Sequence, residues 1–212
     1  MNTTLSIPLA TSWTNATVRI TSIPSKAAPL LNNQAAWRHP SGDGFYTWGG
    51  VMYWFGQPPP LELWKFTADG RGGGAWSEET PRGRTVVTLS QSIRTIHGAW
   101  TQSRDVGYFL GGYANTYTDT GITGAAYLAP PGIMALNMTS GELTNSSTVG
   151  LGANGTLIGG AAQWAPFRDG GAVLVLGGGQ SSVAMAGYGA WTGVPFDKVA
   201  IYEPKGAGPL DA

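Results

Sequence analysis

Residues 36–50 read AWRHPSGDGFYTWGG, and two later segments, 99–112 (AWTQSRDVGYFLGG) and 163–178 (QWAPFRDGGAVLVLGG), follow the same plan. Each runs from a tryptophan through a polar turn and an aromatic or aliphatic stretch to a doubled glycine. The glycine pairs begin 62 and 66 residues apart, and the tryptophans precede them by 12, 11 and 13 residues. This period indicates stacked supersecondary units, because one such unit cannot bury its apolar face alone.

Short strands can be placed at matching positions in all three copies, with aromatic and β-branched residues between glycine and aspartate turns. This composition is typical of antiparallel sheet. We therefore predict an all-β fold built from blades of four antiparallel strands. The expected strands are 34–37, 45–48, 62–66 and one beginning at 75; then 98–100, 108–112 and 133–136; then 161–164, 173–178 and 198–202.

Three features of the first copy are similar to kelch-type β-propellers. They are the doubled glycine that ends the second strand, the third strand Leu63-Trp64-Lys65-Phe66, and the fourth-strand tryptophan Trp76. More narrowly, the chain resembles the galactose-oxidase-like kelch proteins of filamentous fungi over essentially its whole length. The resemblance implies an incomplete β-propeller of about three and a half blades, since closed propellers have about 4 to 8.

We interpret 1–212 as a single partial propeller domain. The end of a preceding blade occupies 1–30, with Leu5–Leu9 as its third strand and Trp13 on its fourth. Blades follow at 31–93 and 94–158, and an incomplete blade at 159–212. The chain is thus expected to be part of a larger protein or a truncated gene model, although four units could also close by pairing the two ends. Because equivalent positions in a repeat have equivalent burial, the repeated tryptophans are expected to fill the space between blades. They are Trp37, Trp100 and Trp164.

The charge pattern excludes two classes of partner. The net charge is zero, only 11% of the residues are charged, and no Lys/Arg cluster occurs. Nucleic acids and anionic membrane surfaces are therefore not expected partners. No apolar run approaches the roughly 18 residues of a membrane helix, so no membrane span is expected in this chain, while an anchor in a missing segment stays open.

Five of the eight asparagines begin an Asn-X-Ser/Thr sequon. The excess predicts N-glycosylation during passage through the secretory pathway, and hence an extracellular or cell-surface protein. The alternative is that turn-rich β-proteins use Asn, Ser and Thr together. No signal sequence is recognisable in residues 1–20. The predicted glycosylation sites are Asn2, Asn15, Asn137, Asn145 and Asn154.

The loops between the second and third strands are long (51–61, 113–131 and 179–197) and are expected on one face, together with the entries to the innermost strands. Long loops on a rigid scaffold are where binding residues gather. These loops are rich in aromatic and poor in charged residues, which suits stacking on sugar rings or anchoring a protein; the alternative is that they pack on the blades. For one candidate, His97, a purely structural role is the alternative. The candidate binding residues are Asn33, Arg94, His97, Trp54, Tyr113, Tyr117 and Trp191.

Catalytic signatures are scarce. The chain has no cysteine and two histidines, and it lacks phosphate loops and a Gly-X-Ser-X-Gly elbow, so we predict no catalytic residue, metal ligand or cofactor. We predict a non-catalytic binding or scaffolding module of a secreted or cell-surface protein, with a protein or glycan partner. The resemblance leaves an alternative: a fragment of a galactose-oxidase-like copper oxidase, or an inactive relative, whose ligands lie outside this chain. That chemistry requires a tyrosine cross-linked to cysteine.

Overall fold

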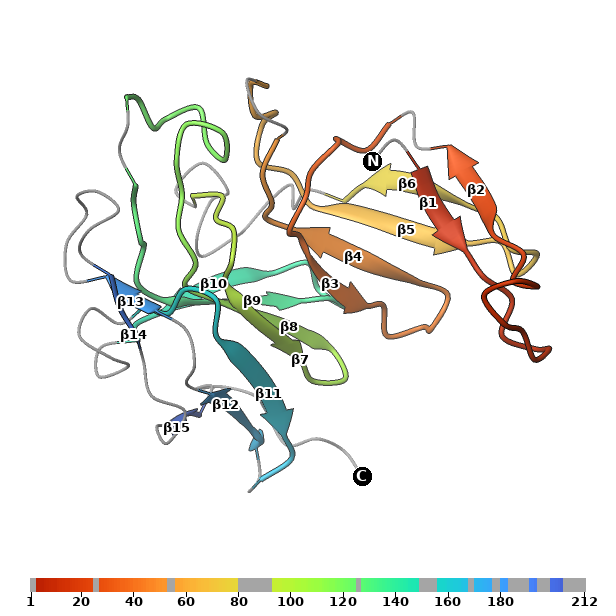
Figure 1. Ribbon diagram of the computed structural model, residues 1–212. Coiled ribbons are helices and arrows are strands. Elements are labelled where there is room, and N and C mark those ends of the chain that lie inside the picture. Colours follow the sequence, from red (N-terminus) through yellow and green to blue (C-terminus); the bar gives the residue numbers. More distant parts are fainter. Residues whose placement is uncertain are drawn as a thin grey trace.

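A computed structural model describes residues 3–24, 27–52, 56–79, 93–124, 127–148, 156–167, 170–176, 180–182, 191–193 and 199–203. Within these ranges the fold is all-β and contains no α-helix. All strand pairs are antiparallel, and they form two four-stranded sheets, one three-stranded sheet and two two-stranded sheets. Figure 1 shows the larger sheets side by side, as in successive blades.

In the first two blades, the strands lie side by side in chain order. The first blade contains β3 (Ala35–Arg38), β4 (Gly44–Trp48), β5 (Trp64–Ala68) and β6 (Gly74–Glu78). The second contains β7 (Ala99–Gln102), β8 (Val106–Leu110), β9 (Ile133–Asn137) and β10 (Leu143–Ser146). The predicted four-stranded antiparallel sheets are therefore confirmed.

The third sheet has three strands: β11 (Ala161–Ala165), β12 (Ala172–Leu176) and β15 (Val199–Tyr202). The segment 179–197, expected to be a loop, contributes a separate two-stranded sheet of β13 (Gln180–Ser182) and β14 (Trp191–Gly193). The described strands thus give two complete blades and a third of three strands, and they do not close a ring.

The hydrophobic core lies between the blades. One cluster joins Trp37, Trp48 and Leu63 of the first blade to Phe109 and Leu136 of the second. A second cluster joins the other face of the second blade to the third blade through Tyr108, Ile133, Val173 and their neighbours. The second blade therefore buries apolar side chains of both its faces against the neighbouring blades, as expected for stacked units of a repeat.

The three repeated tryptophans are not equivalently buried, so the expectation that all three fill the space between blades is wrong. Trp37 is 0% exposed and packs over Gly107, where an added Cβ would lie 2.4 Å from the indole. Trp164 is half-buried and stacks on Tyr108, with ring centroids 5.5 Å apart. Trp100 is 44% exposed, although it lies on the innermost strand of its blade.

Register explains the difference. In the first blade, Trp37 pairs with Tyr46 of the next strand. Tyr108 occupies the position of Tyr46 in the second blade, and it pairs with Thr101 and not with Trp100. Successive side chains of a strand point to opposite faces, so the one-residue offset turns Trp100 away from the face that Trp37 occupies. The same one-residue offset is present in the sequence, where Trp37 precedes its glycine pair by 12 residues and Trp100 precedes its pair by 11.

Side chains link the innermost strands of neighbouring blades. The Gln102 carboxamide accepts the Arg38 backbone N–H at 2.6 Å and donates to the Arg38 carbonyl at 3.1 Å. Thr101 Oγ1 accepts the backbone N–H of Trp164 at 2.8 Å. These contacts fix β3, β7 and β11 beside one another, and thereby position the strand entries that precede them.

The N-terminal hairpin consists of β1 (Thr3–Ser6) and β2 (Thr21–Pro24). Trp13, expected on a fourth strand, lies instead in the exposed connection between them, so that strand assignment is wrong. The hairpin meets the first blade through Trp76, whose indole N–H donates to Thr4 Oγ1 at 2.9 Å.

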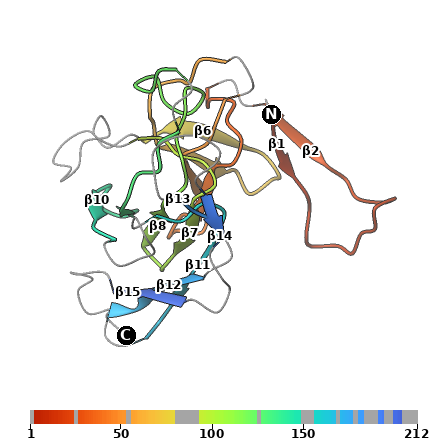
Figure 2. The same cartoon turned by 60° about the vertical axis from the view of Figure 1, so that its left-hand side comes forward.

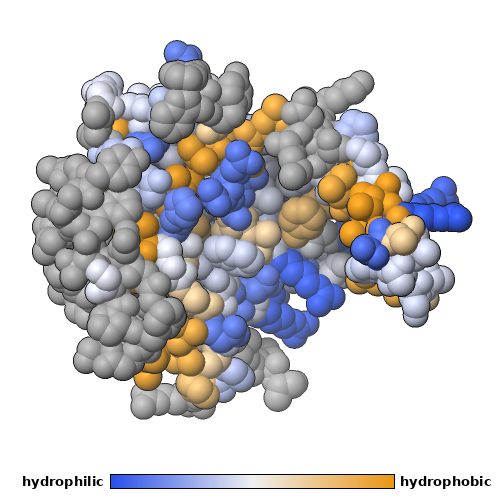
Figure 3. All heavy atoms as spheres, viewed as in Figure 1, coloured by the Kyte–Doolittle hydropathy of each residue, from blue (hydrophilic) through white to orange (hydrophobic). Residues whose placement is uncertain are grey.

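The hairpin projects from the side of the sheets, as Figure 2 shows. Figure 3 shows hydrophobic side chains on this part of the surface, and Leu5 and Leu9 are exposed there. Apolar patches of this kind are typical of contact surfaces.

Candidate functional site

The described parts of the long loops of the first two blades rise from the same end of their sheets (Figure 1). A backbone hydrogen bond of 3.1 Å from Met52 to Tyr117 joins the two loops. Of the third long loop, the structure describes only β13 and β14. The predicted gathering of long loops on one face therefore holds for the first two blades, and we call this the loop face.

The entries to the innermost strands repeat one backbone geometry. Asn33, His97 and Gly159 occupy matching positions and have φ angles of 57°, 56° and 72°. Left-handed backbone is uncommon for residues other than glycine, and asparagine and histidine are among those that tolerate it best. The His97 carbonyl accepts the Gly159 N–H at 2.7 Å, which ties neighbouring entries together. Asn33 and His97 are both exposed there.

His97, Tyr113 and Tyr127 form a continuous group of rings, which we call the aromatic stack. The imidazole of His97 lies nearly parallel to Tyr113, with centroids 5.7 Å apart and an angle of 9° between planes. The Tyr127 ring follows at 5.5 Å from Tyr113. His97 is exposed and the two tyrosines are half-buried. One face of the imidazole covers Tyr113, and the exposure of His97 leaves the end of the stack accessible to solvent.

Arg94, a candidate binding residue, is 1% exposed and is engaged inside the protein. Its guanidinium donates to the carbonyls of Pro59 (2.9 Å), Thr118 (3.2 Å) and Pro60. Burial lowers the pKa of Arg94, and the negative charges of Asp119 and Glu62 oppose that change. The Arg94 guanidinium stays charged, because arginine is not deprotonated in proteins. Arg94 therefore connects the two long loops and does not face solvent.

The segment around Tyr117 is held by a local turn. Tyr117 N–H donates to Asn115 Oδ1 at 2.9 Å, and Asn115 N–H donates to Thr118 Oγ1 at 2.8 Å. The candidate Tyr117 is half-buried in this turn. Together with the Arg94 contacts, these bonds fix the described loop backbone, so the loop face presents its rings in a set geometry.

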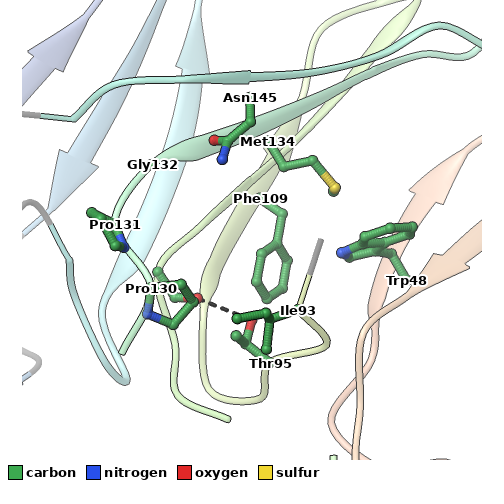
Figure 4. A pocket seen from close by; sticks show the side chains of 10 residues that line it. Trp48, Ile93, Thr95, Phe109, Pro130, Pro131, Gly132, Met134 and Asn145 are labelled. Carbon is green, nitrogen blue, oxygen red and sulfur yellow. Dashed lines mark hydrogen bonds between the residues drawn. The ribbon is translucent and has the colours of Figure 1, made fainter. Parts of the chain in front are cut away.

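A pocket of about 110 Å³ opens between the first two blades, and we call it the inter-blade pocket. Trp48 of β4 lines one side, and Phe109 of β8 and Met134 of β9 line another. Pro130, Pro131 and Asn145 contribute further lining, as Figure 4 shows. Sequence reasoning missed this pocket, because its walls come from segments that are far apart in the chain.

The other predicted site residues are more scattered. Trp54 lies outside the described residues, as do Asn2 and Asn154. Trp191 begins β14, and its side chain is outside the described part of the structure. Of the remaining sequon asparagines, Asn15 and Asn145 are exposed, whereas half-buried Asn137 accepts the N–H groups of Thr139 and Ser140 through Oδ1 at 3.0 Å each.

The described residues supply neither a set of metal ligands nor a membrane segment. No three His, Asp or Glu side chains among them are grouped so that they could hold a metal ion. His39 lies in the turn between β3 and β4, at the opposite end of the blades from His97. No helix in the described ranges is long and apolar enough to cross a membrane.

Comparisons with known sequences leave the family open. Neither the protein-family models nor the curated proteins contain a match to this chain. The interpretation of its function therefore depends on the repeat, the fold and the site described above.

Proposed function

We propose that the chain is part of a kelch-type β-propeller of the galactose-oxidase-like kind and serves as a non-catalytic binding module for an uncharged glycan. The aromatic stack on the loop face is the observation that carries this proposal. Sugar rings present flat patches of C–H groups, and aromatic faces bind such patches while adjacent polar atoms bond the hydroxyl groups. The stack offers the exposed His97 ring backed by Tyr113 and Tyr127.

The electrostatics favour a neutral ligand. The chain has a net charge of zero. The guanidinium of Arg94 donates hydrogen bonds to carbonyls inside the protein and does not face a ligand. Protein interfaces commonly use accessible arginines and large aromatic anchors as hot spots. On the described loop face, the rings are accompanied by turns and carbonyls and not by accessible cations, so a glycan fits better than a protein.

The copper-oxidase alternative lacks support from the residues of this chain. The cross-linked tyrosine–cysteine pair requires a cysteine, and the sequence has none. The two histidines lie at opposite ends of the described blades, so they cannot share one metal ion. We therefore propose binding and no catalytic step.

A glycan array tests this proposal with a matched pair of variants. We expect the wild-type protein to bind a subset of neutral glycans, and we expect Tyr113→Ala to weaken that binding about tenfold to thirtyfold, because the ring that supports His97 is lost. The control is Phe167→Ala, which removes an exposed ring from the turn at the opposite end of the third blade. Equal binding by both variants, or no glycan binding by the wild type, would contradict the proposal.

We further propose that the protein reaches the cell exterior through the secretory pathway. Asn15 is exposed in the connection between β1 and β2, so we expect glycosylation there when the chain is expressed behind a secretory signal in a eukaryotic host. Intact-mass measurement should show a shift that an amide-linkage glycosidase removes, and Asn15→Gln should abolish the Asn15-derived part of it. A wild-type protein of unmodified mass would count against the secretory assignment.

A further inference from the structure

We propose that two copies of this chain associate head to tail, with the third blade of each copy packed against the N-terminal hairpin of the other. The proposal depends on the packing of the sheets and goes beyond the proposed glycan binding. Three observations carry it. One repeat position is buried in two blades and exposed in the third, both ends of the row of sheets present an uncharged face, and two copies together have enough units for a ring.

The third blade has one covered face and one open face. Val173 and Val175 of β12 belong to the cluster shared with the second blade, and Ala200 of β15 packs against that cluster. Successive side chains of a strand point to opposite faces, so Leu176 of β12 and Val199 of β15 lie on the other side of the sheet. They pair with each other in the register and are 37% and 54% exposed. We call this side the open face of the third blade.

The second blade shows how the same position is used when another sheet follows. Leu110 directly precedes its glycine pair, as Leu176 does in the third blade. Leu110 pairs with Ile133 just as Leu176 pairs with Val199. Leu110 and Ile133 are each 1% exposed and belong to the cluster that the third blade covers. The open face of the third blade is thus the next contact surface in the series of blades.

The first blade repeats the pattern. Trp48 directly precedes its glycine pair, and Leu63 directly precedes Trp64, which pairs with Thr47. Trp48 and Leu63 are 3% and 2% exposed, in the cluster shared with the second blade. An apolar pair at this position is therefore buried by a following sheet in both blades that have one.

The hairpin lies at the other end of the row of sheets, and it too has an open face. Thr4 and Ile23 are a register pair, and Thr4 accepts the indole N–H of Trp76, so this side lies against the first blade. Leu5 and its partner Ser22 lie on the opposite side, which we call the open face of the hairpin. Leu5 is 54% exposed. Figures 1 and 2 show the hairpin and the third blade at opposite ends of the described sheets.

The two open faces suit each other as partners. In this chain, the side of a blade that carries the residue before the glycine pair meets the opposite side of the following sheet. The third blade has its free side toward a following sheet, and the hairpin has its free side toward a preceding one. The described strand residues of both open faces are uncharged, so their contact buries no unpaired charge.

A second copy supplies both missing surfaces at once. A head-to-tail contact closes into a ring when its rotation allows, and it otherwise extends into a filament. Each copy contributes the hairpin and three blades. Two copies therefore have about eight units, which is within the range of closed propellers.

Sedimentation velocity over a concentration series tests the proposal. We expect the wild-type protein to form a discrete particle of twice the 22.1 kDa chain mass. Val199→Lys and Leu5→Glu each place a charge in the contact, and each variant alone should associate at least about tenfold more weakly. An equimolar mixture of the two variants should regain the dimer, because the introduced lysine and glutamate meet in one contact and the other contact is unchanged.

The variants need a check of folding and a matched control. Both replaced side chains are 54% exposed within one copy, so circular dichroism of the two variants should match that of the wild type. Trp100→Lys replaces an exposed apolar side chain of the second blade, which has a sheet on either side, and it should dimerise like the wild type. Hydrogen–deuterium exchange of the wild type needs no variant, and it should show β1, β2 and β15 protected together as the concentration rises.

Three results would overturn the proposal. The first is a wild-type protein that is monomeric at every concentration. The second is a continuous series of larger particles, because the contact then does not close with two copies. The third is a dimer that Val199→Lys disrupts and Leu5→Glu leaves intact, because two third blades would then pair with each other and the hairpin would have no part in the contact.

Discussion

Trp37→Ala is expected to lower the free energy of unfolding by about 3 to 5 kcal/mol, whereas Trp100→Ala should lower it by less than about 1 kcal/mol. Both tryptophans belong to the same repeat and lie on the innermost strands of their blades. Trp37 is 0% exposed in the cluster between the first two blades, and its removal leaves a cavity. Trp100 is 44% exposed, so little buried contact is lost.

Urea denaturation followed by circular dichroism measures both changes, and each variant is the control of the other. The comparison is sensitive because the stability of a domain is only about 5 to 15 kcal/mol, so the Trp37 variant should unfold in much less denaturant. A Trp100 variant as unstable as the Trp37 variant would show that the register of β7 against β8 described above is incorrect.

Arg94→Met is the second change with a large expected effect. The substitution keeps an apolar stem and removes the donors to three carbonyls, so we expect a loss of about 2 to 4 kcal/mol. The two long loops should also separate, because Arg94 joins Pro59 and Pro60 of one to Thr118 of the other. Denaturation gives the first result, and faster chymotryptic cleavage after Tyr117 in the second loop gives the second.

Arg104→Met is the matched control, since Arg104 is an exposed arginine in the turn between β7 and β8. Its loss should change stability by less than about 0.5 kcal/mol and leave the proteolysis pattern unaltered. If the two methionine variants behaved alike, the role of Arg94 in connecting the loops would be refuted.

The strands could be predicted from the sequence because local chemistry determines them. The segment 34–37 was expected and Ala35–Arg38 is observed, and the segment 133–136 was expected where Ile133–Asn137 is observed. Glycine pairs and aspartate turns end these strands at defined places. The β13–β14 pair was missed, because its short strands lie in a segment that carries no repeat signal.

Burial was harder to predict, because it depends on register and on neighbouring blades. A one-residue difference in spacing places Trp100 on the opposite face of its strand from Trp37. The number and period of the repeats do not determine the face to which a given side chain points. Arg94 was expected at the loop face, yet its two terminal guanidinium nitrogens donate to carbonyls of two loops inside the protein. Only the folded chain brings those loops together.

The candidate site was partly predictable for the same reason. His97 and Tyr113 were selected from their positions in a strand entry and a long loop, and the structure stacks them. Tyr127 was visible in the sequence as a loop aromatic, but nothing in the sequence linked it to Tyr113. Trp48 and Asn145 are almost a hundred residues apart, and the pocket that they line exists only where two blades meet.

Hydrogen–deuterium exchange with and without a bound glycan tests the central claim, that the loop face is the binding site. The account predicts slower exchange of backbone amides in the segments 94–98, 111–119 and 127–134, which carry the aromatic stack and the pocket. It predicts unchanged exchange in the turns 39–43 and 103–105 at the opposite end of the blades. Protection of those turns, with no change in the three loop-face segments, would contradict it.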